Sequence, residues 1–261
     1  MLRKIQSALS QLPELARKYR ILKDKRLLDD ILSAEQLEQY LYTSACIGRS
    51  QGYLRSIKEG MCVDAQGEPI PWLNYPAIEQ LAKWDFSGKD IFEYGCGNST
   101  RWWAKRAKSV VSVEASTEWY DKILAERILP PNVNPILAPL DENSDTAAVE
   151  RHAHAIDAFG EFDVIVIDGF SGHKARLACT QAALGHLRTG GMIILDNADW
   201  HPESARTLRD AGFLEIDYCG LGPLNTHSEI SSFFLSAGFR PTPLSDTHPG
   251  YCIGGLERQL G

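Results

Sequence analysis

From residue 90 onwards, short apolar segments alternate with segments of helical periodicity. Strands are predicted at residues 90–94, 110–114, 135–138, 162–168, 191–196, 213–218 and 230–235. Helices are predicted between the first six strands, at residues 100–108, 117–128, 145–159, 174–187 and 202–211. This alternation predicts parallel strands joined by crossover helices that cover both faces of one sheet.

The last two predicted strands are joined differently from the others. Only residues 220–225 separate them, and this stretch contains two glycines and a proline but no helix. A short connection of this kind predicts an antiparallel pair at one edge of the sheet. The expected fold class is therefore α/β, with a doubly wound, mostly parallel seven-stranded sheet, a terminal antiparallel hairpin and an N-terminal helical extension.

The first part of the chain has a different character and is predicted to form a separate region. Residues 2–47 carry apolar residues at helical spacing, and residues 67–76 form a proline-rich loop that contains Trp72 and Tyr75. We expect residues 1–74 to form a helical cap with an entry loop, and residues 75–261 to form the main domain. The two loop aromatics either line a ligand pocket or are buried between the cap and the sheet.

The charge is unevenly distributed along the chain. Residues 1–26 hold eight Lys or Arg and only two acidic residues, although the whole chain has a net charge of −7. This basic arm is a solvated helix face, a segment that docks on anionic membrane lipid or nucleic acid, or an Arg-rich presequence interrupted by Glu14 and Asp24. The acidic remainder argues against nucleic acid as the substrate.

The composition also predicts where the protein is found. No run of eighteen apolar residues is present, and the N-terminus lacks the apolar core of a secretory signal. The six cysteines are scattered without the close spacing of a metal site, which indicates free thiols in a reducing compartment. We expect a cytoplasmic protein, and the sequence leaves its oligomeric state open.

A tight glycine turn follows the first predicted strand. The stretch 91–100 reads Ile-Phe-Glu-Tyr-Gly-Cys-Gly-Asn-Ser-Thr, with Glu93 near the strand end and Ser99 and Thr100 available to cap the next helix. Glycine has no Cβ, so such a turn lets the backbone approach a ligand closely. In open α/β sheets, ligands bind outside the carboxyl ends of the strands.

Acidic residues accumulate at these same strand ends. Glu93, Glu114 and Asp168 end the first, second and fourth predicted strands, and Asp196 with Asn197 ends the fifth. Carboxylates gathered at one sheet edge are costly to bury unless hydroxyl groups, a cation or a metal satisfy them.

The spacing of the glycine turn and Glu114 indicates a nucleoside site. Glu114 follows Gly95 by nineteen residues, where a carboxylate can accept both hydroxyl groups of a ribose. This pattern fits nicotinamide dinucleotides as well as S-adenosylmethionine. Thr100 stands where the dinucleotide pattern has a third glycine, and Glu93 suits a cationic ligand better than a pyrophosphate. These features favour S-adenosylmethionine.

Taken together, these motifs resemble those of class I S-adenosylmethionine-dependent methyltransferases over about residues 75–237. The motifs are Glu93–Thr100, Val113-Glu114, residues 162–169 and Leu187–Asn197. The resemblance implies that the backbone at Gly95 and Gly97 holds the methionine part, Glu93 its amino group and Glu114 the ribose, and that Asp141 or Glu142 meets the adenine. The complete implied cofactor site is Glu93, Tyr94, Gly95, Gly97, Asn98, Ser99, Glu114, Ala115, Asp141 and Asp168.

Asp168, Asp196 and Asn197 further resemble the metal-binding pattern of catechol-type O-methyltransferases. That resemblance implies a divalent cation such as Mg²⁺, which would lower the pKa of a substrate hydroxyl group. The family's lysine base is replaced here by Ser171, so His173 and Lys174 are the candidate bases, with Asp168 as the third catalytic residue. The alternative is that the two aspartates contact the ligand or helix ends without a metal.

The expected function is therefore methyl transfer from S-adenosylmethionine, with a hydroxyl group of a small molecule or glycan as acceptor. The whole pattern, including the entry loop at residues 67–76, also looks like bacterial methyltransferases that are associated with the modification of glycans or small molecules. Two alternatives remain: an NAD-dependent oxidoreductase on a similar scaffold, and a nucleoside-binding module without catalysis.

Overall fold

The computed structural model describes residues 32–125, 129–169, 172–246 and 250–255, and the chain divides into two compact units, Met1–Gly48 and Arg49–Gly261. Most of helix α4 (Ala34–Ser50) belongs to the first unit. The basic arm and the helices expected before residue 32 lie outside the described residues. The domain boundary expected after residue 74 stays a prediction. No described helix combines the length and apolar character needed to cross a membrane.

The second unit is built on a seven-stranded sheet with the strand order β3-β2-β1-β4-β5-β7-β6. Its strands are β1 (Asp90–Tyr94), β2 (Ser109–Glu114), β3 (Val133–Leu137), β4 (Phe162–Ile167), β5 (Leu187–Leu195), β6 (Leu214–Leu221) and β7 (Ser228–Leu235). Strands β1 to β5 are parallel, whereas β7 pairs antiparallel with both β5 and β6. The predicted fold class is confirmed, including the terminal hairpin.

The described helices and short 3₁₀ segments of this unit connect the strands. They are α5 (Tyr53–Glu59), α6 (Tyr75–Leu81), α7 (Asn98–Ala104), α8 (Thr117–Ala125), α9 (Thr146–Ala153), η2 (His154–Ala158), α10 (His173–Leu184), η3 (Ala198–Trp200) and α11 (Pro202–Asp210). The single helix predicted at residues 145–159 is instead α9 followed by η2. Helix α10 ends before the predicted residue 187, because Leu187 is already the first residue of β5.

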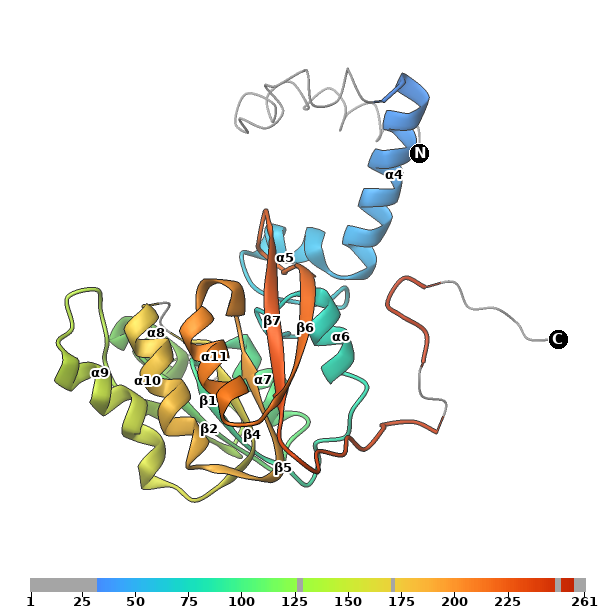
Figure 1. Cartoon of the computed structure of the whole chain (residues 1–261). Helices are drawn as coiled ribbons and strands as arrows, with labels where there is room; N and C mark the ends of the chain where they lie inside the picture. Colours follow the sequence, from blue (N-terminus) through green and yellow to red (C-terminus); the bar gives the residue numbers. More distant parts are fainter. Residues whose placement is uncertain (1–31, 126–128, 170–171, 247–249, 256–261) are drawn as a thin grey trace. The chain divides into compact units, whose positions relative to one another are not determined.

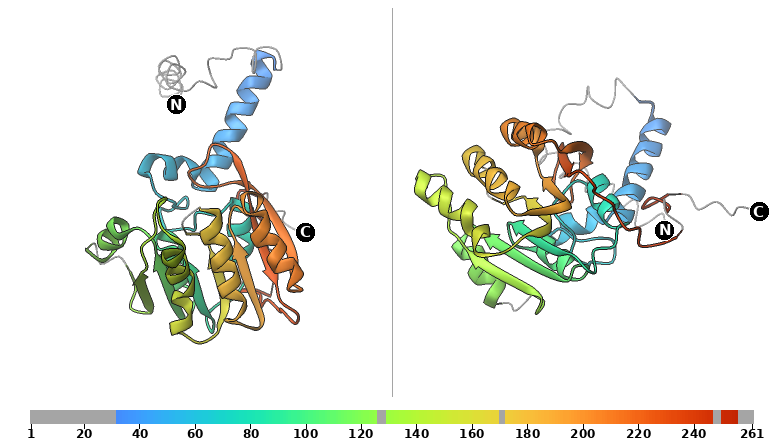
Figure 2. Two further views of the ribbon diagram at one scale, coloured as in Figure 1. Left: turned by 60° about the vertical axis from the view of Figure 1, so that its left-hand side comes forward. Right: turned by 60° about the horizontal axis from the view of Figure 1, so that its bottom comes forward.

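The central strands are buried on both faces. Neighbouring residues point to opposite sides of a strand, so Ile91 packs into one apolar core and Phe92 into the other. Val164 and Ile165 of β4 divide in the same way. Helices α9, α10 and α11 cover one face side by side (Figures 1 and 2), while α6 and α7 contribute to the core on the other. This arrangement fixes the strand ends that carry the site.

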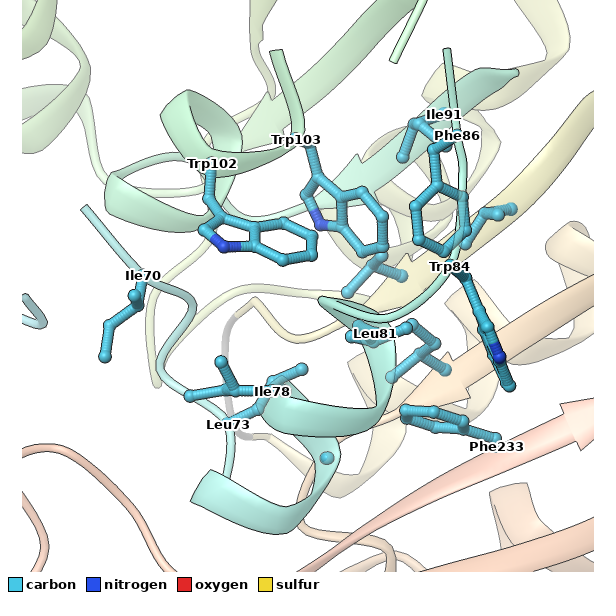
Figure 3. Packing of buried hydrophobic residues seen from close by; sticks show 14 of the residues in the cluster. Ile70, Leu73, Ile78, Leu81, Trp84, Phe86, Ile91, Trp102, Trp103 and Phe233 are labelled. Carbon is cyan, nitrogen blue, oxygen red and sulfur yellow. The ribbon is translucent and has the colours of Figure 1, made fainter. Parts of the chain in front are cut away.

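Aromatic packing dominates the core on the α6 and α7 side (Figure 3). The rings of Trp102 and Trp103 meet edge to face with centroids 4.8 Å apart, and Phe86 meets Trp103 in the same way at 5.1 Å. Leu81 of α6 is fully buried in this cluster. Helix α6 begins at its N-cap Asn74, whose side-chain oxygen accepts a hydrogen bond from the backbone N–H of Ala77 at 3.1 Å.

An ion-pair cluster joins β1 and β4 near their amino ends. The guanidinium of Arg188 lies 3.0 Å from a carboxylate oxygen of Asp90 and 2.6 Å from one of Asp163. The side chain of Arg188 is partly exposed, and the cluster is remote from the carboxyl ends of the same strands. We assign it a structural role.

Replacement of Trp103 tests the core. The side chain is fully buried, and its indole N–H has no hydrogen-bond partner among the described residues. We expect Trp103→Ala to lower the free energy of unfolding by about 3–5 kcal/mol because it leaves a large cavity. Urea unfolding followed by circular dichroism measures the change.

Trp103→Phe is the matched control. It keeps much of the ring volume and removes the buried N–H, so we expect it to cost much less stability than the alanine variant. An equal loss in both variants would contradict the packing argument.

Candidate active site

A cavity of about 680 Å³ lies at the carboxyl ends of β1, β2 and β4. The strand order reverses at β1, since the chain runs outward through β2 and β3 and then returns to β4 on its other side. This is the position at which open α/β sheets bind ligands. The lining residues are Gly60, Met61, Cys62, Trp72, Gly95, Cys96, Gly97, Asn98, Ser99, Glu114, Ala115, Ser116, Trp119, Leu140, Asp141, Glu142, Asp168, Gly169 and Leu224.

The glycine turn is forced by the close approach of two backbones. Gly95 has φ of +118°, and a Cβ built there would lie 3.1 Å from the carbonyl oxygen of Asp168. Gly169 meets Gly95 from the other side, where a Cβ would lie 3.2 Å from the Tyr94 backbone. The turn after β1 and the turn after β4 therefore pack directly on each other, and both line the cavity.

Helix α7 begins earlier than predicted. Its first residue is Asn98, so Ser99 and Thr100 lie inside the first turn and are not the N-cap. The Thr100 hydroxyl instead accepts a hydrogen bond from the backbone N–H of Gly97 at 3.0 Å and donates one to Glu93 at 2.5 Å. Thr100 therefore does cap the helix, from its third position and through the backbone N–H of the N-cap residue Gly97.

Glu114 holds the glycine turn against the end of β2. One carboxylate oxygen accepts the backbone N–H of Cys96 at 3.0 Å, and the other accepts that of Ser116 at 2.7 Å. Burial raises the pKa of Glu114, and these N–H donors oppose the shift. Each oxygen can accept a further hydrogen bond, so Glu114 can still receive the two hydroxyl groups of a ribose from the cavity.

Glu93 and Tyr94 do not line the cavity. Glu93 is buried beneath the turn, and this burial raises its pKa to about 7, against the opposing effect of the Ser99 and Thr100 hydroxyl groups. Tyr94 points to the other face of the sheet, where its hydroxyl donates to the carbonyl of Ala153 at 2.6 Å. Glu93 therefore supports the turn from below through Thr100, whereas Tyr94 belongs to the core on the other face of the sheet.

The remaining predicted cofactor residues line the cavity. Asn98, Ser99 and Ala115 do so together with the turn glycines, and so do Asp141 and Glu142, whose contact with adenine stays a prediction. Asp141 also accepts hydrogen bonds from the backbone N–H of Asn143 and the hydroxyl of Ser144, both at 2.9 Å.

The three predicted catalytic residues separate in the structure. Asp168 lines the cavity, and 25% of its side-chain surface is exposed there. Lys174 is exposed in the first turn of α10 and is not a lining residue, and His173 is the first residue of that helix. Of Asp168 and Lys174, Asp168 is the one that lines the cavity.

The predicted metal set does not fit a divalent cation, because an arginine already lies among its members. The buried guanidinium of Arg176 donates to the carboxylate of Asp168 at 3.4 Å and to the backbone carbonyl of Asp196 at 3.1 Å. The Asp196 carboxylate accepts the Ser231 hydroxyl at 2.7 Å, and the Asn197 amide donates to Glu229 at 3.0 Å. No cluster of three His, Cys, Asp or Glu suited to a metal occurs within the described ranges.

Several site residues were not identified from the sequence. Trp119 walls the cavity, and its indole N–H donates to the carbonyl of Cys96 at 2.6 Å. Met61, Cys62 and Leu224 reach the cavity from loops outside the parallel sheet. The two entry-loop aromatics were predicted either to line a ligand pocket or to be buried. Trp72 lines the cavity, and Tyr75 is buried.

Comparison with known families agrees with this geometry. Residues 92–198, which contain the glycine turn, Glu114 and Asp168, match the family model described as a methyltransferase domain. This stretch is a methyltransferase domain. The expected enzyme class, an S-adenosylmethionine-dependent methyltransferase, is thereby confirmed at the level of the family. No curated protein matches the chain.

Solved structures similar to this chain include other methyltransferases. The precorrin-6y C5,15-methyltransferase of Geobacter metallireducens is 14% identical with a TM-score of 0.44, over 61% of this chain and 86% of that one. The N-methyltransferase NodS of Bradyrhizobium japonicum, solved with S-adenosyl-L-homocysteine, is 13% identical with a TM-score of 0.39, over 57% and 78% of the two chains. Such distant similarities do not identify the acceptor.

The buried carboxyl of Glu93 makes stability depend on pH. Its raised pKa of about 7 means that the folded state binds more protons than the unfolded state from about pH 4.5 up to that value. Ionisation of Glu93 therefore lowers the free energy of unfolding by on the order of 3 kcal/mol as the pH rises through that window. We expect Glu93→Gln to become more stable relative to wild type between pH 5 and pH 8, measured by urea unfolding at each pH.

The matched control is Glu118→Gln on α8, where the side chain is exposed. It is expected to leave the pH dependence unchanged. Parallel stability curves for wild type and Glu93→Gln would contradict the argument.

Proposed function

We propose that this methyltransferase domain transfers the methyl group of S-adenosylmethionine to a hydroxyl group of a small molecule or glycan. The proposal is supported above all by Asp168, which lines the cavity and whose backbone carbonyl packs on Gly95 of the glycine turn. It places a proton acceptor next to the position where the resemblance puts the methionine part of the cofactor.

The proposed cofactor part of the cavity is formed by the glycine turn and the segment that follows β2. The turn Gly95–Ser99 and residues Ala115 and Ser116 surround it, with Glu114 at the ribose position. Trp119 fixes this wall because its indole is hydrogen-bonded to the turn itself. A flat wall with one buried carboxylate suits a nucleoside with a free ribose.

The acceptor part is formed by side chains from other segments. Met61, Cys62, Trp72 and Leu224 line it, and burial raises the pKa of the Cys62 thiol to about 12, so that thiol stays neutral. No Lys, Arg or His side chain is among the described residues that line the cavity. A lining with carboxylates and without cations favours an uncharged acceptor over a phosphorylated one.

The reaction requires the acceptor oxygen to lie in line with the methyl–sulfur bond. An oxygen lone pair forms the new bond to the methyl carbon, the carbon–sulfur bond breaks, and its electron pair stays on sulfur to give S-adenosylhomocysteine. The hydroxyl proton passes to Asp168. Burial raises the pKa of Asp168 and makes it a better base, while Arg176 opposes the shift.

Cofactor choice is tested by calorimetry with S-adenosylhomocysteine and with NAD. We expect S-adenosylhomocysteine to bind and NAD not to bind. Glu114→Ala should weaken the binding of S-adenosylhomocysteine by about 10- to 100-fold, because hydrogen bonds to an ionised group are lost.

The control for this experiment is Glu150→Ala, an exposed glutamate on α9 that does not line the cavity. Its affinity for S-adenosylhomocysteine should equal that of wild type. Binding of NAD alone would refute the proposal and support the oxidoreductase alternative.

Catalysis is tested with labelled S-adenosylmethionine and a pool of small-molecule and glycan acceptors. We expect transfer of the label to oxygen, and a loss of about 10²-fold or more in Asp168→Asn, since the amide cannot accept the proton. Methyl transfer is followed by chromatography of the labelled products.

Asp163→Asn is the matched control, since it makes the same change near the amino end of the same strand, β4. It is expected to retain transfer. Binding of S-adenosylhomocysteine without transfer to any acceptor would favour the non-catalytic alternative, and labelled nitrogen or carbon products would refute a hydroxyl acceptor.

A further inference from the structure

We infer that Arg176 is the built-in cation of this site: its guanidinium contacts the Asp168 carboxylate and the Asp196 backbone carbonyl, two members of the metal set that the catechol-type resemblance implies, and it holds Asp168 in position without a metal. Arg176 is in helix α10, eight residues after Asp168. Its side chain is only 3% exposed, so bulk water does not screen its charge.

The contacts of this guanidinium join the ends of two neighbouring strands. One nitrogen donates to the carbonyl of Ile167 at 2.6 Å and to that of Asp196 at 3.1 Å. The other donates to the carbonyl of Gly169 at 3.0 Å and to the carboxylate of Asp168 at 3.4 Å. These four acceptors come from the ends of β4 and β5 and the turn after β4. They are hard oxygen atoms of the kind that would otherwise suit Mg²⁺.

The surrounding acids explain why a cation is needed here. Asp168 interacts electrostatically with acids or thiols from every segment around it: Cys62 before the entry loop, Glu93 of β1, Glu114 of β2, Asp196 after β5 and Glu229 of β7. Arg176 is the cation that opposes the raised pKa values of both Asp168 and Asp196. A buried positive charge in this place would repel a divalent cation.

The other members of the implied metal set are also engaged. The carboxylate of Asp196 accepts the Ser231 hydroxyl, and Asn197 adopts a left-handed backbone with φ of 52° that directs its amide to Glu229. Such a conformation is uncommon outside glycine and persists where the surroundings enforce it. These contacts tie the end of β5 to β7 through hydrogen bonds of protein groups alone.

Arg176 is accordingly a positioning residue and not a catalytic one, since it is not a lining residue of the cavity. It keeps Asp168 ionised and oriented, and Asp168 faces the cofactor and acceptor. The role in methyl transfer rests on the proposed function, whereas the preference for an arginine over a metal rests on the contacts alone.

The first test uses Mn²⁺ alone, followed by electron paramagnetic resonance, on wild type and Asp196→Asn. We expect no difference between the two proteins, and we expect wild type to bind S-adenosylhomocysteine equally well with EDTA and with Mg²⁺. Stoichiometric Mn²⁺ binding that is lost in Asp196→Asn would overturn the inference. If S-adenosylhomocysteine does not bind under either condition, the proposed function fails while the Mn²⁺ result still decides the role of Arg176.

The second test compares the pH dependence of S-adenosylhomocysteine affinity in Arg176→Met, Arg176→Lys and wild type. Without the guanidinium, Asp168 loses the charge that lowers its pKa, so its proton is released at a higher pH. We expect the pH at which affinity is lost on acidification to move upward in Arg176→Met and to stay closer to wild type in Arg176→Lys. An unchanged pH profile in Arg176→Met would overturn the inference.

Arg188→Met is the matched control, because Arg188 also bridges two strands through carboxylates, but near their amino ends. It is expected to lower stability without moving the pH profile. If Arg176→Met does not fold, the lysine variant and the Mn²⁺ comparison still decide the outcome.

Discussion

Buried negative charge is the constraint on which the carboxyl edge of this sheet depends. Glu93, Asp168, Asp196 and Glu229 all lie there, and an unpaired buried carboxylate costs several kcal/mol. Each accepts a hydrogen bond in its own way, although Oε1 of Glu93 and Oε1 of Glu229 have no partner among the described residues. Thr100 donates to Glu93, Ser231 to Asp196 and Asn197 to Glu229, while Asp168 receives the guanidinium of Arg176. The turns that form the cavity are held in place by these contacts.

Much of this architecture could be predicted from the sequence because its determinants are local. Apolar runs alternating with helical stretches defined the strands, and the connection without a helix indicated the hairpin. The glycine turn was recognisable for the same reason, since a close backbone approach requires glycine whatever lies on the other side. The two-residue period of a strand also predicts that Tyr94 points to the face of the sheet opposite to Glu93, as the structure has it.

What could not be predicted depends on contacts between distant segments. Arg176 is an ordinary position in a helical stretch until α10 is placed against the ends of β4 and β5. Asn197 has an amide oxygen of the kind that can bind a metal, but β7 brings the carboxylate of Glu229 to its amide nitrogen. Trp119 looks like any aromatic of an amphipathic helix, and its bond to the glycine turn follows from the packing of α8. A local sequence pattern cannot show which of several possible partners a polar group contacts in the folded protein.

The two parts of the cavity have different origins along the chain. The cofactor part lies inside the methyltransferase domain at residues 92–198, whereas Met61, Cys62, Trp72 and Leu224 come from before and after it. The outer residues are linked to one another, since the Trp72 indole and the Tyr53 hydroxyl both donate to Asn225 beside Leu224. Evolution could therefore exchange the acceptor-facing segments as a pair while leaving cofactor recognition intact. Residues 92–198 and the segments on either side of them thus contribute separable parts of one cavity.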